Sequence, residues 1–375
     1  MKKKVLFIIE SFALGGAERA LLDIVDNIDT DKFDVSIVSL YKHSVYARYK
    51  DMINVELKPE IKCRYLVNNH VKWLYIPFNY LLNKVPSLLY RLLIGDRYDV
   101  AVAFYEGAPT YLVSKARLRR GKKMAWLQTS VALSQKNKSE DAVKAEGERY
   151  KAFYRVVALS NGVAESFVSM FPFMKEKVVV AYHPMQIGKI VSKGEESIDA
   201  GEPSRPLLLS VGRMTWAKGY DRYLRVLERL KAKGFQFTVW ILGGGDRTEF
   251  EKYRDEAGLD NVRFFGNVEN PYPYMRLADW LVLPSYVEGF GTVSMEAMAL
   301  GTPVLATRCS GTAELLGDSE FGLVVDNDEA SLEAGLEKIL TDSDLKRRYE
   351  STTKERASRF DVDACLERIQ EVLDV

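Results

Sequence analysis

Two glutamates, Glu288 and Glu296, flank a glycine-containing turn, Gly289-Phe290-Gly291. An apolar run precedes the turn, and an alanine- and methionine-rich segment typical of a short helix follows it. The N–H groups of such a turn, together with the positive end of the helix, can bind phosphate. An ionised carboxylate such as Glu296 can accept both O–H groups of a ribose diol. Either feature alone is equally typical of a tight turn and a solvated helix, but together they predict a nucleoside diphosphate site, with Glu288 beside the hydroxyls of an attached sugar.

A second loop, at residues 212–219, carries two cations, Arg213 and Lys218. Both could neutralise a diphosphate without a metal ion, although solvated loop cations would give the same pattern. Short aspartate pairs near residues 326, 342 and 361 are typical of helix caps. We therefore predict no metal site and no other cofactor.

Repeated apolar runs that end in polar or glycine turns must position these side chains. Runs that are short enough for buried strands occur at residues 5–9, 34–40, 55–57, 100–104, 124–127, 156–159, 178–181, 207–211, 237–242, 262–265, 280–284, 304–306 and 323–325. Most are followed by a helical pattern. This alternation predicts α/β domains with parallel sheets, whose loops at the carboxyl ends of the strands form a site.

The length of 375 residues favours two domains. The alternation of predicted strands and helices is interrupted by a polar stretch without hydrophobic periodicity and then resumes. We predict a first domain at residues 1–186, a linker at 187–206, a second domain at 207–358 and a final helix at 359–375.

Composition excludes several classes of protein. A net charge of +1 is not typical of a nucleic-acid-binding chain. The three cysteines, Cys63, Cys309 and Cys365, lack disulfide or metal spacing, which favours a reducing compartment. The apolar run at residues 5–9 is too short for a signal peptide. We therefore expect a cytoplasmic protein.

Residues 71–94 are rich in apolar and aromatic side chains, but they also contain Lys72, Lys84, Arg91 and two prolines. The segment is too interrupted to span a bilayer. Core helices are favoured, and the alternative is an amphipathic surface at a membrane interface. Six cations without an acid at residues 115–123 support that alternative, because they would attract anionic lipid on the inner face of a cell membrane.

The segments G-R-M-T-W-A-K-G, L-G-G-G-D, G-N-V-E-N-P-Y-P-Y and E-G-F-G-T-V-S-M-E resemble the nucleotide-sugar domain of retaining glycosyltransferases of family 4, also called group 1. The first loop, I-E-S-F-A-L-G-G-A-E-R, is also similar to that family. The resemblance implies a GT-B fold, in which two Rossmann-like domains with parallel sheets face each other across a cleft. It also implies a Glu-seven residues-Glu motif, here Glu288 and Glu296.

The resemblance further implies roles for individual residues. Arg213 and Lys218 match the pair that holds the donor diphosphate, and with Glu288 near the transferred sugar they are the expected catalytic residues. Glu296 matches the residue that binds the ribose, and the nucleobase would rest on backbone groups near Arg263 to Gly266. The other residues expected to bind the donor are Gly15, Gly16, Gly243, Phe290, Gly291 and Thr292.

One position departs from the family pattern. Many members have a histidine where this chain has Gln128, and a neutral amide can bind a hydroxyl but cannot act as a general base. Gln128 and Glu106, which follow two strands of the first domain, are the expected acceptor-side residues.

The resemblance implies transfer of a sugar from a nucleoside-diphosphate sugar to a lipid-linked or polysaccharide acceptor in cell-surface glycan assembly. A uridine diphosphate sugar is the expected donor and a guanosine one the runner-up. Retention would need no side-chain nucleophile, because the acceptor hydroxyl can attack on the face from which the diphosphate leaves. Two alternatives remain open, a nucleotide-sugar epimerase or isomerase and a non-catalytic regulatory subunit of a partner transferase.

Overall fold

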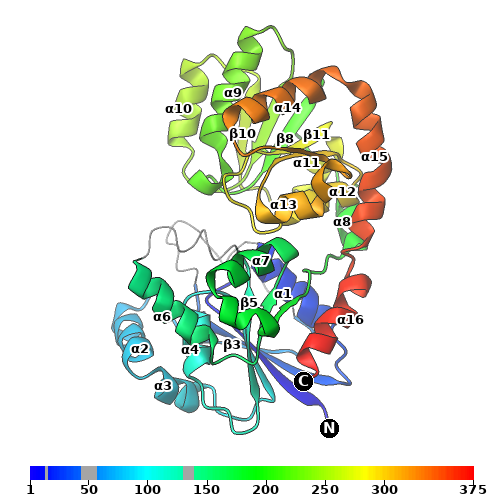
Figure 1. The fold of residues 1–375 in the computed structure, drawn as a ribbon. Coiled ribbons are helices and arrows are strands. Elements are labelled where there is room, and N and C mark those ends of the chain that lie inside the picture. Colours follow the sequence, from blue (N-terminus) through cyan, green and yellow to red (C-terminus); the bar gives the residue numbers. More distant parts are fainter. Residues whose placement is uncertain (13–15, 44–56, 130–138) are drawn as a thin grey trace. The chain divides into compact units, whose positions relative to one another are not determined.

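The computed structural model describes residues 1–12, 16–43, 57–129 and 139–375, which form two compact α/β units (Figure 1). The first unit comprises Met1–Pro184 and Val362–Val375, and the second comprises Met185–Asp361. The strand predicted at residues 55–57 lies mostly outside the described residues. Each unit is built on its own parallel sheet, as the alternating pattern predicted.

The first unit contains a seven-stranded parallel sheet in the order β3-β2-β1-β4-β5-β6-β7. Its strands are β1 (Lys3–Ile9), β2 (Phe33–Tyr41), β3 (Lys62–Val67), β4 (Val100–Ala103), β5 (Lys122–Leu127), β6 (Arg155–Ala158) and β7 (Val178–Val180). Val5 pairs with Val35 on one side and with Val100 on the other, so the strand order reverses between β1 and β4. Such a reversal is where open parallel sheets bind ligands.

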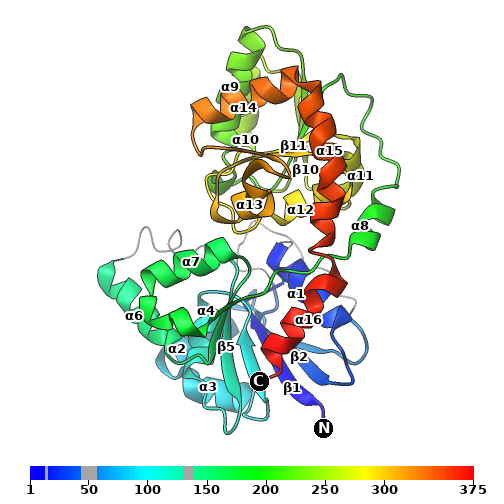
Figure 2. The same ribbon diagram turned by 45° about the vertical axis from the view of Figure 1, so that its right-hand side comes forward.

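Helices cover the sheet of the first unit. They are α1 (Gly16–Asn27), α2 (Lys72–Lys84), α3 (Pro86–Leu93), α4 (Ala108–Lys115), α6 (Glu140–Tyr150), α7 (Asn161–Met170) and α16 (Val362–Leu373). The last helix, α16, lies beside α1 (Figure 2). Its apolar stripe, Ile369, Val372 and Leu373, joins the core that surrounds Val5 and Phe7.

Strand β3 was not predicted from the sequence. It is an edge strand, and its residues Lys62, Cys63, Arg64 and Tyr65 are exposed. A strand without a buried face has no apolar run or alternation, so hydrophobic patterning cannot detect it.

The second unit contains a six-stranded parallel sheet in the order β10-β9-β8-β11-β12-β13. Its strands are β8 (Leu207–Val211), β9 (Thr238–Leu242), β10 (Val262–Gly266), β11 (Trp280–Leu283), β12 (Val304–Thr307) and β13 (Leu323–Val325). Its helices are α8 (Ile187–Lys193), α9 (Tyr220–Ala232), α10 (Thr248–Glu256), α11 (Tyr272–Leu277), α12 (Thr292–Ala299), α13 (Ser310–Leu315), α14 (Glu329–Thr341) and α15 (Ser343–Ser358). Counted within the unit, this order is that of a Rossmann fold, with its reversal between β8 and β11.

The stretch expected to be a linker, residues 187–206, begins with a packed helix. Helix α8 contacts α11 and α12, and its Ile190 is buried. Asn270 donates a hydrogen bond to the carbonyl of Lys193 at 2.8 Å. This helix therefore belongs to the second unit.

His183 is buried in the first unit just after β7. Its ring lies 6.0 Å from that of Phe104, and in the described part of the chain its Nε2 has no hydrogen-bond partner. Burial lowers the pKa of His183 to about 4. The folded protein therefore holds this imidazole neutral at pH values where an exposed histidine gains a proton.

The pH dependence of stability should report this histidine. Between pH 6.5 and 4 the unfolded chain binds a proton that the folded chain does not, so stability should fall as the pH falls. From pH 7 to 5 the loss should be about 2 kcal/mol. Urea denaturation at both pH values should show that His183→Asn removes this loss and that the exposed His70→Asn does not. Equal pH dependence in the two variants would contradict the assignment.

Candidate functional site

The reversal of strand order in the second unit brings two loops together. One follows β8 (residues 212–219) and the other follows β11 (residues 284–291). Gly219, with φ +66°, ends the first loop, and a Cβ there would lie 2.0 Å from the carbonyl oxygen of Pro284. Only glycine permits this approach, so the amino end of α9 can lie directly against the loop after β11.

The two loops are joined by an ion pair. Lys218 Nζ lies 2.5 Å from Glu288 Oε2, and the side chains of Lys218 and Glu288 are 21% and 15% exposed. The sequence predicted both residues for the same site, and the structure places them in direct contact. Ser285 Oγ also donates to the Glu288 carboxylate, at 3.5 Å. Glu288 is therefore held by groups from both loops.

Helix α12 begins at this loop. Gly291, with φ +75°, is its N-cap residue, and Thr292 is its first residue. The first N–H groups of a helix have no carbonyl acceptor within that helix, so they are available for an anion. The Phe290 side chain is buried against Phe360, with ring centroids 5.3 Å apart. Only the backbone of Phe290 can therefore bind a ligand, which agrees with the predicted role of the N–H groups of this turn.

Glu296 lies in the second turn of α12 and is buried. Its carboxylate accepts a hydrogen bond from the Tyr272 hydroxyl at 3.3 Å. Glu288 and Glu296 thus have different partners. Tyr272 lies in the segment G-N-V-E-N-P-Y-P-Y, but nothing local in that segment predicts its contact with Glu296, 24 residues further along the chain.

The remaining donor-side candidates lie on neighbouring strands. Arg213 is exposed on the loop after β8. Gly243, just after β9, lies so close to that loop that a Cβ would come within 1.9 Å of the Gly212 carbonyl oxygen. The Arg263 guanidinium donates to the Ala200 carbonyl at 2.8 Å and stacks on the Phe265 ring. The Arg263 side chain is thus occupied by contacts with Ala200 and Phe265. A nucleobase bound here would contact the backbone of Arg263 and not its guanidinium.

One residue missed from the sequence is Arg222, in α9, which is only 1% exposed. Its guanidinium donates five hydrogen bonds, all to neutral oxygens of Pro284, Ser285, Thr307 and Asn327. It also lies 4.1 Å from the centroid of the Tyr286 ring. Burial lowers the pKa of Arg222. This cation holds the chain immediately before Glu288.

Cys309 lies beneath the same loop. Burial, with the nearby charge of Glu288, raises the pKa of the Cys309 thiol to about 11. The thiol therefore remains protonated and is a poor nucleophile at neutral pH. Among the described residues, no group of three His, Cys, Asp or Glu side chains could hold a metal ion.

The acceptor-side candidates lie in the first unit. The Glu106 carboxylate follows β4 and accepts hydrogen bonds from the N–H groups of Gln128 and Thr129 at 2.8 and 3.0 Å. Burial raises the pKa of Glu106. The Gln128 side chain is buried, and neither polar atom of its amide has a partner among the described residues. The structure thus brings Glu106 and Gln128 together and leaves an amide that could bind a hydroxyl.

The glycine pair of the first loop is only partly described. Gly16 is the exposed first residue of α1. Gly15 lies outside the described residues.

Comparison with known proteins adds family information to this geometry. Residues 193–356 match the family described as "Glycosyl transferases group 1". Over 376 residues the chain is 29% identical to N-acetylgalactosamine-N,N'-diacetylbacillosaminyl-diphospho-undecaprenol 4-alpha-N-acetylgalactosaminyltransferase of Campylobacter jejuni, with 96% of each chain covered. It is 30% identical over 171 residues to the lipopolysaccharide glucosyltransferase WaaG of Escherichia coli, which covers 45% of this chain and 46% of that one.

A solved structure supports the same fold. Anabaena Alr3699/HepE in complex with UDP and glucose has a TM-score of 0.77 at 20% identity, over 99% of both chains.

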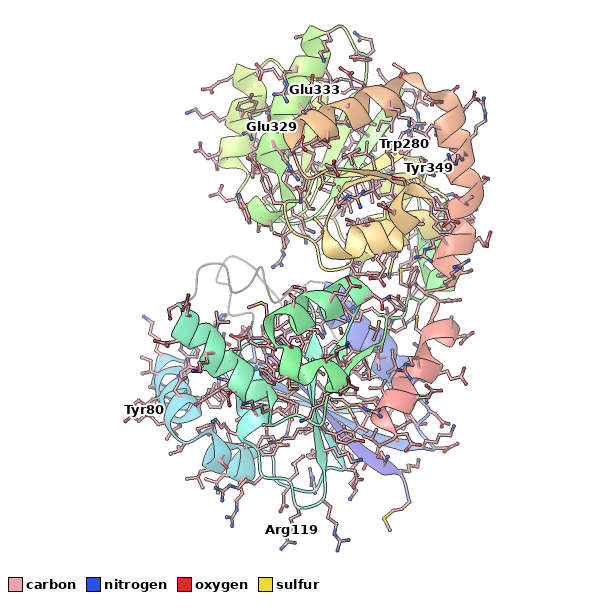
Figure 3. All side chains as sticks on the ribbon, in the orientation of Figure 1. Tyr80, Arg119, Trp280, Glu329, Glu333 and Tyr349 are labelled. Atoms are coloured by element: carbon pink, nitrogen blue, oxygen red, sulfur yellow. The ribbon has the colours of Figure 1, made fainter. Side chains whose placement is uncertain are left out.

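Arg222 should be the most stability-sensitive cation near the site. Arg222→Met leaves buried carbonyl oxygens without donors, which should lower the free energy of unfolding of the second unit by about 3 kcal/mol. The matched control is Arg225→Met, one turn further along α9. Arg225 is partly exposed and pairs with Glu329, which is labelled in Figure 3, so its loss should cost below about 1 kcal/mol. Urea denaturation measures both, and equal losses would contradict the role of Arg222.

Proposed function

We propose that this chain transfers a sugar from a UDP-sugar to an acceptor hydroxyl with retention of configuration. The chain belongs to the group 1 glycosyltransferases and has their GT-B fold. The observation that carries the proposal is the contact between Lys218 and Glu288 beside the amino end of α12. A cation, backbone N–H groups and carboxylates then lie where a sugar diphosphate needs them.

In this proposal the diphosphate binds at the amino end of α12 and contacts Lys218 and Arg213. Lys218 already pairs with Glu288, so it can bridge that carboxylate and a phosphate oxygen. Glu288 is thereby held close to the phosphate, where its carboxylate can accept hydrogen bonds from hydroxyl groups of the transferred sugar. Glu296, oriented by Tyr272, accepts hydrogen bonds from the hydroxyl groups of the ribose.

The reaction breaks the bond between the anomeric carbon and the diphosphate oxygen and forms a bond to the acceptor oxygen on the same face. The proton of the acceptor hydroxyl passes to the departing phosphate oxygen. No side-chain nucleophile is required. Lys218, Arg213 and the N–H groups of α12 stabilise the charge that develops on the leaving group. We propose that these groups suffice without a metal ion.

The relatives guide the choice of donor and acceptor. The Anabaena structure contains UDP and glucose, which supports a UDP-sugar donor. The name of the Campylobacter relative includes a diphospho-undecaprenol acceptor, which supports a lipid-linked acceptor and a role in cell-surface glycan assembly. The proposed contacts of an acceptor hydroxyl are Glu106 and the amide of Gln128, which has no hydrogen-bond partner among the described residues. We place the reaction in the cytoplasm, at the inner face of the membrane.

Loss of either proposed phosphate contact should slow transfer. Lys218→Met and Arg213→Ala should each reduce kcat by about 100- to 1000-fold, because each removes a group that stabilises the leaving diphosphate. Lys252→Met, on the exposed surface of α10, is the matched control and should retain full activity. Release of nucleoside diphosphate measures turnover, and NMR of the product reports the anomeric configuration. Unchanged turnover in either variant, or an inverted product, would contradict the mechanism.

Nucleotide binding tests the donor independently of the acceptor. UDP should raise the melting temperature in the presence of EDTA more than GDP or ADP does. At a hundred times its Kd a ligand stabilises the folded state by about 2.7 kcal/mol. Glu296→Gln should weaken the response to UDP, because a neutral amide oxygen is a poorer acceptor for the ribose hydroxyls. A larger shift with GDP would replace the proposed donor, and no shift without a divalent ion would exclude metal-independent binding.

A further inference from the structure

Helices α2 and α3 expose many large apolar side chains on the first unit. Trp73 is 75% exposed, Leu92 is 72% exposed and Tyr80 is 63% exposed. Figure 3 shows Tyr80 on the outside of α2. The α2–α3 surface comprises these residues with Leu74, Ile76, Leu81, Val85, Leu88 and Leu93. Large apolar patches of this kind on a protein surface usually mark a site of interaction.

Helical periodicity explains why these residues remain exposed. In α2 the buried residues are Phe78 and Leu82, at a spacing of four, and they face the body of the unit. Trp73, Ile76 and Tyr80 recur at spacings of three and four on another face of the same helix. Each helix therefore carries more apolar surface than one core-facing stripe requires. The sequence favoured core helices here, and the structure shows that only one face of each is buried.

The segment that contains α2 and α3 carries charges of one sign, although Lys62 at its start pairs with Asp34. Residues 61–95 contain no acidic residue, and their cations are Lys62, Arg64, Lys72, Lys84 and Arg91. The basic segment 115–123, which runs from the end of α4 through a loop into β5, reaches the residues just after α3, since Arg119 lies 3.6 Å from Asp96. Figure 3 shows Arg119 projecting from this loop. Exposed apolar side chains thus lie beside a run of cations.

We infer that the α2–α3 surface docks onto the headgroup region of an anionic phospholipid bilayer. Trp73, Ile76 and Leu92 would enter the boundary between headgroups and acyl chains. The lysine and arginine side chains would lie at the level of the lipid phosphates. The choice of a lipid surface as the occupant rests on the lipid-linked acceptor of the proposed function. No helix in the described part of the chain is long and apolar enough to cross a membrane.

Charge favours a bilayer over a second copy of the chain. In a symmetric dimer the same surface meets itself, so the cations of one α2–α3 surface would face those of the other. Residues 61–95 offer no carboxylate to pair with them, and Asp96, the next residue, already pairs with Arg119. An anionic membrane, by contrast, supplies the opposite charge over the whole surface.

Vesicle co-sedimentation of the full chain without donor or acceptor tests this inference. We expect binding to vesicles of phosphatidylglycerol and phosphatidylcholine at low salt, weakened by high salt and absent with phosphatidylcholine alone. The double variant Ile76→Glu, Leu92→Glu should reduce binding by about tenfold or more. Phe173→Glu changes another exposed apolar residue of the same unit, outside this surface, and this variant should bind like the unmodified chain.

Tryptophan fluorescence shows which part of the chain enters the lipid. Anionic vesicles should shift the emission to shorter wavelength, and Trp73→Phe should abolish most of this shift. Trp216→Phe, which removes an exposed tryptophan of the second unit, should preserve it.

Three outcomes would overturn the inference. These are no vesicle binding at low salt, equal binding by the double variant, or a dimer in solution that the double variant abolishes without any vesicle binding. Because no donor is present, these outcomes do not depend on whether the proposed transfer occurs. UDP binding and transfer to a soluble acceptor analogue are measured separately, so failure of either proposal can be recognised by itself.

Discussion

Arg222 is the residue on which the geometry of the second unit's site depends. Its guanidinium is removed from water, yet among the described residues its hydrogen bonds go to neutral oxygens and its plane lies over the face of Tyr286. Arginine suits this position better than lysine, because its planar fork can serve several acceptors at once. Desolvation of the cation is offset only while the carbonyls of Pro284 and Ser285 stay in place. The start of the loop that carries Glu288 is therefore fixed by a group outside the site.

The ion pair between Lys218 and Glu288 follows from this constraint. Gly219 lets the end of the first loop touch Pro284, and Arg222 donates hydrogen bonds to the Pro284 carbonyl. Tyr286 also donates its N–H to the Ala217 carbonyl at 2.9 Å and stacks on Trp216. Backbone, ring and charge contacts thus join the same two loops. A site assembled in this way loses little conformational entropy when an anion binds.

The α2–α3 surface shows a different use of apolar residues. In the second unit, apolar side chains of α9 such as Tyr223 and Leu227 are buried in the core, and its exposed face carries Arg225 and Arg229. In α2 a second apolar stripe replaces such a charged face. Exposed apolar surface is unfavourable in water. Its free energy falls when this surface is transferred into an apolar environment such as the acyl region of a bilayer.

The sequence alone determined the α/β architecture and most strands, and it predicted the residues of a donor site. Buried parallel strands are continuous apolar runs, and turns at their ends require glycine, so local patterns carry this information. Only the tertiary structure decided that Lys218 pairs with Glu288, that Glu296 meets Tyr272 and that Arg222 is buried. The partners of Arg222 lie 62 to 105 residues away along the chain. Whether a polar side chain is solvated or buried depends on such distant neighbours, and no local pattern records them.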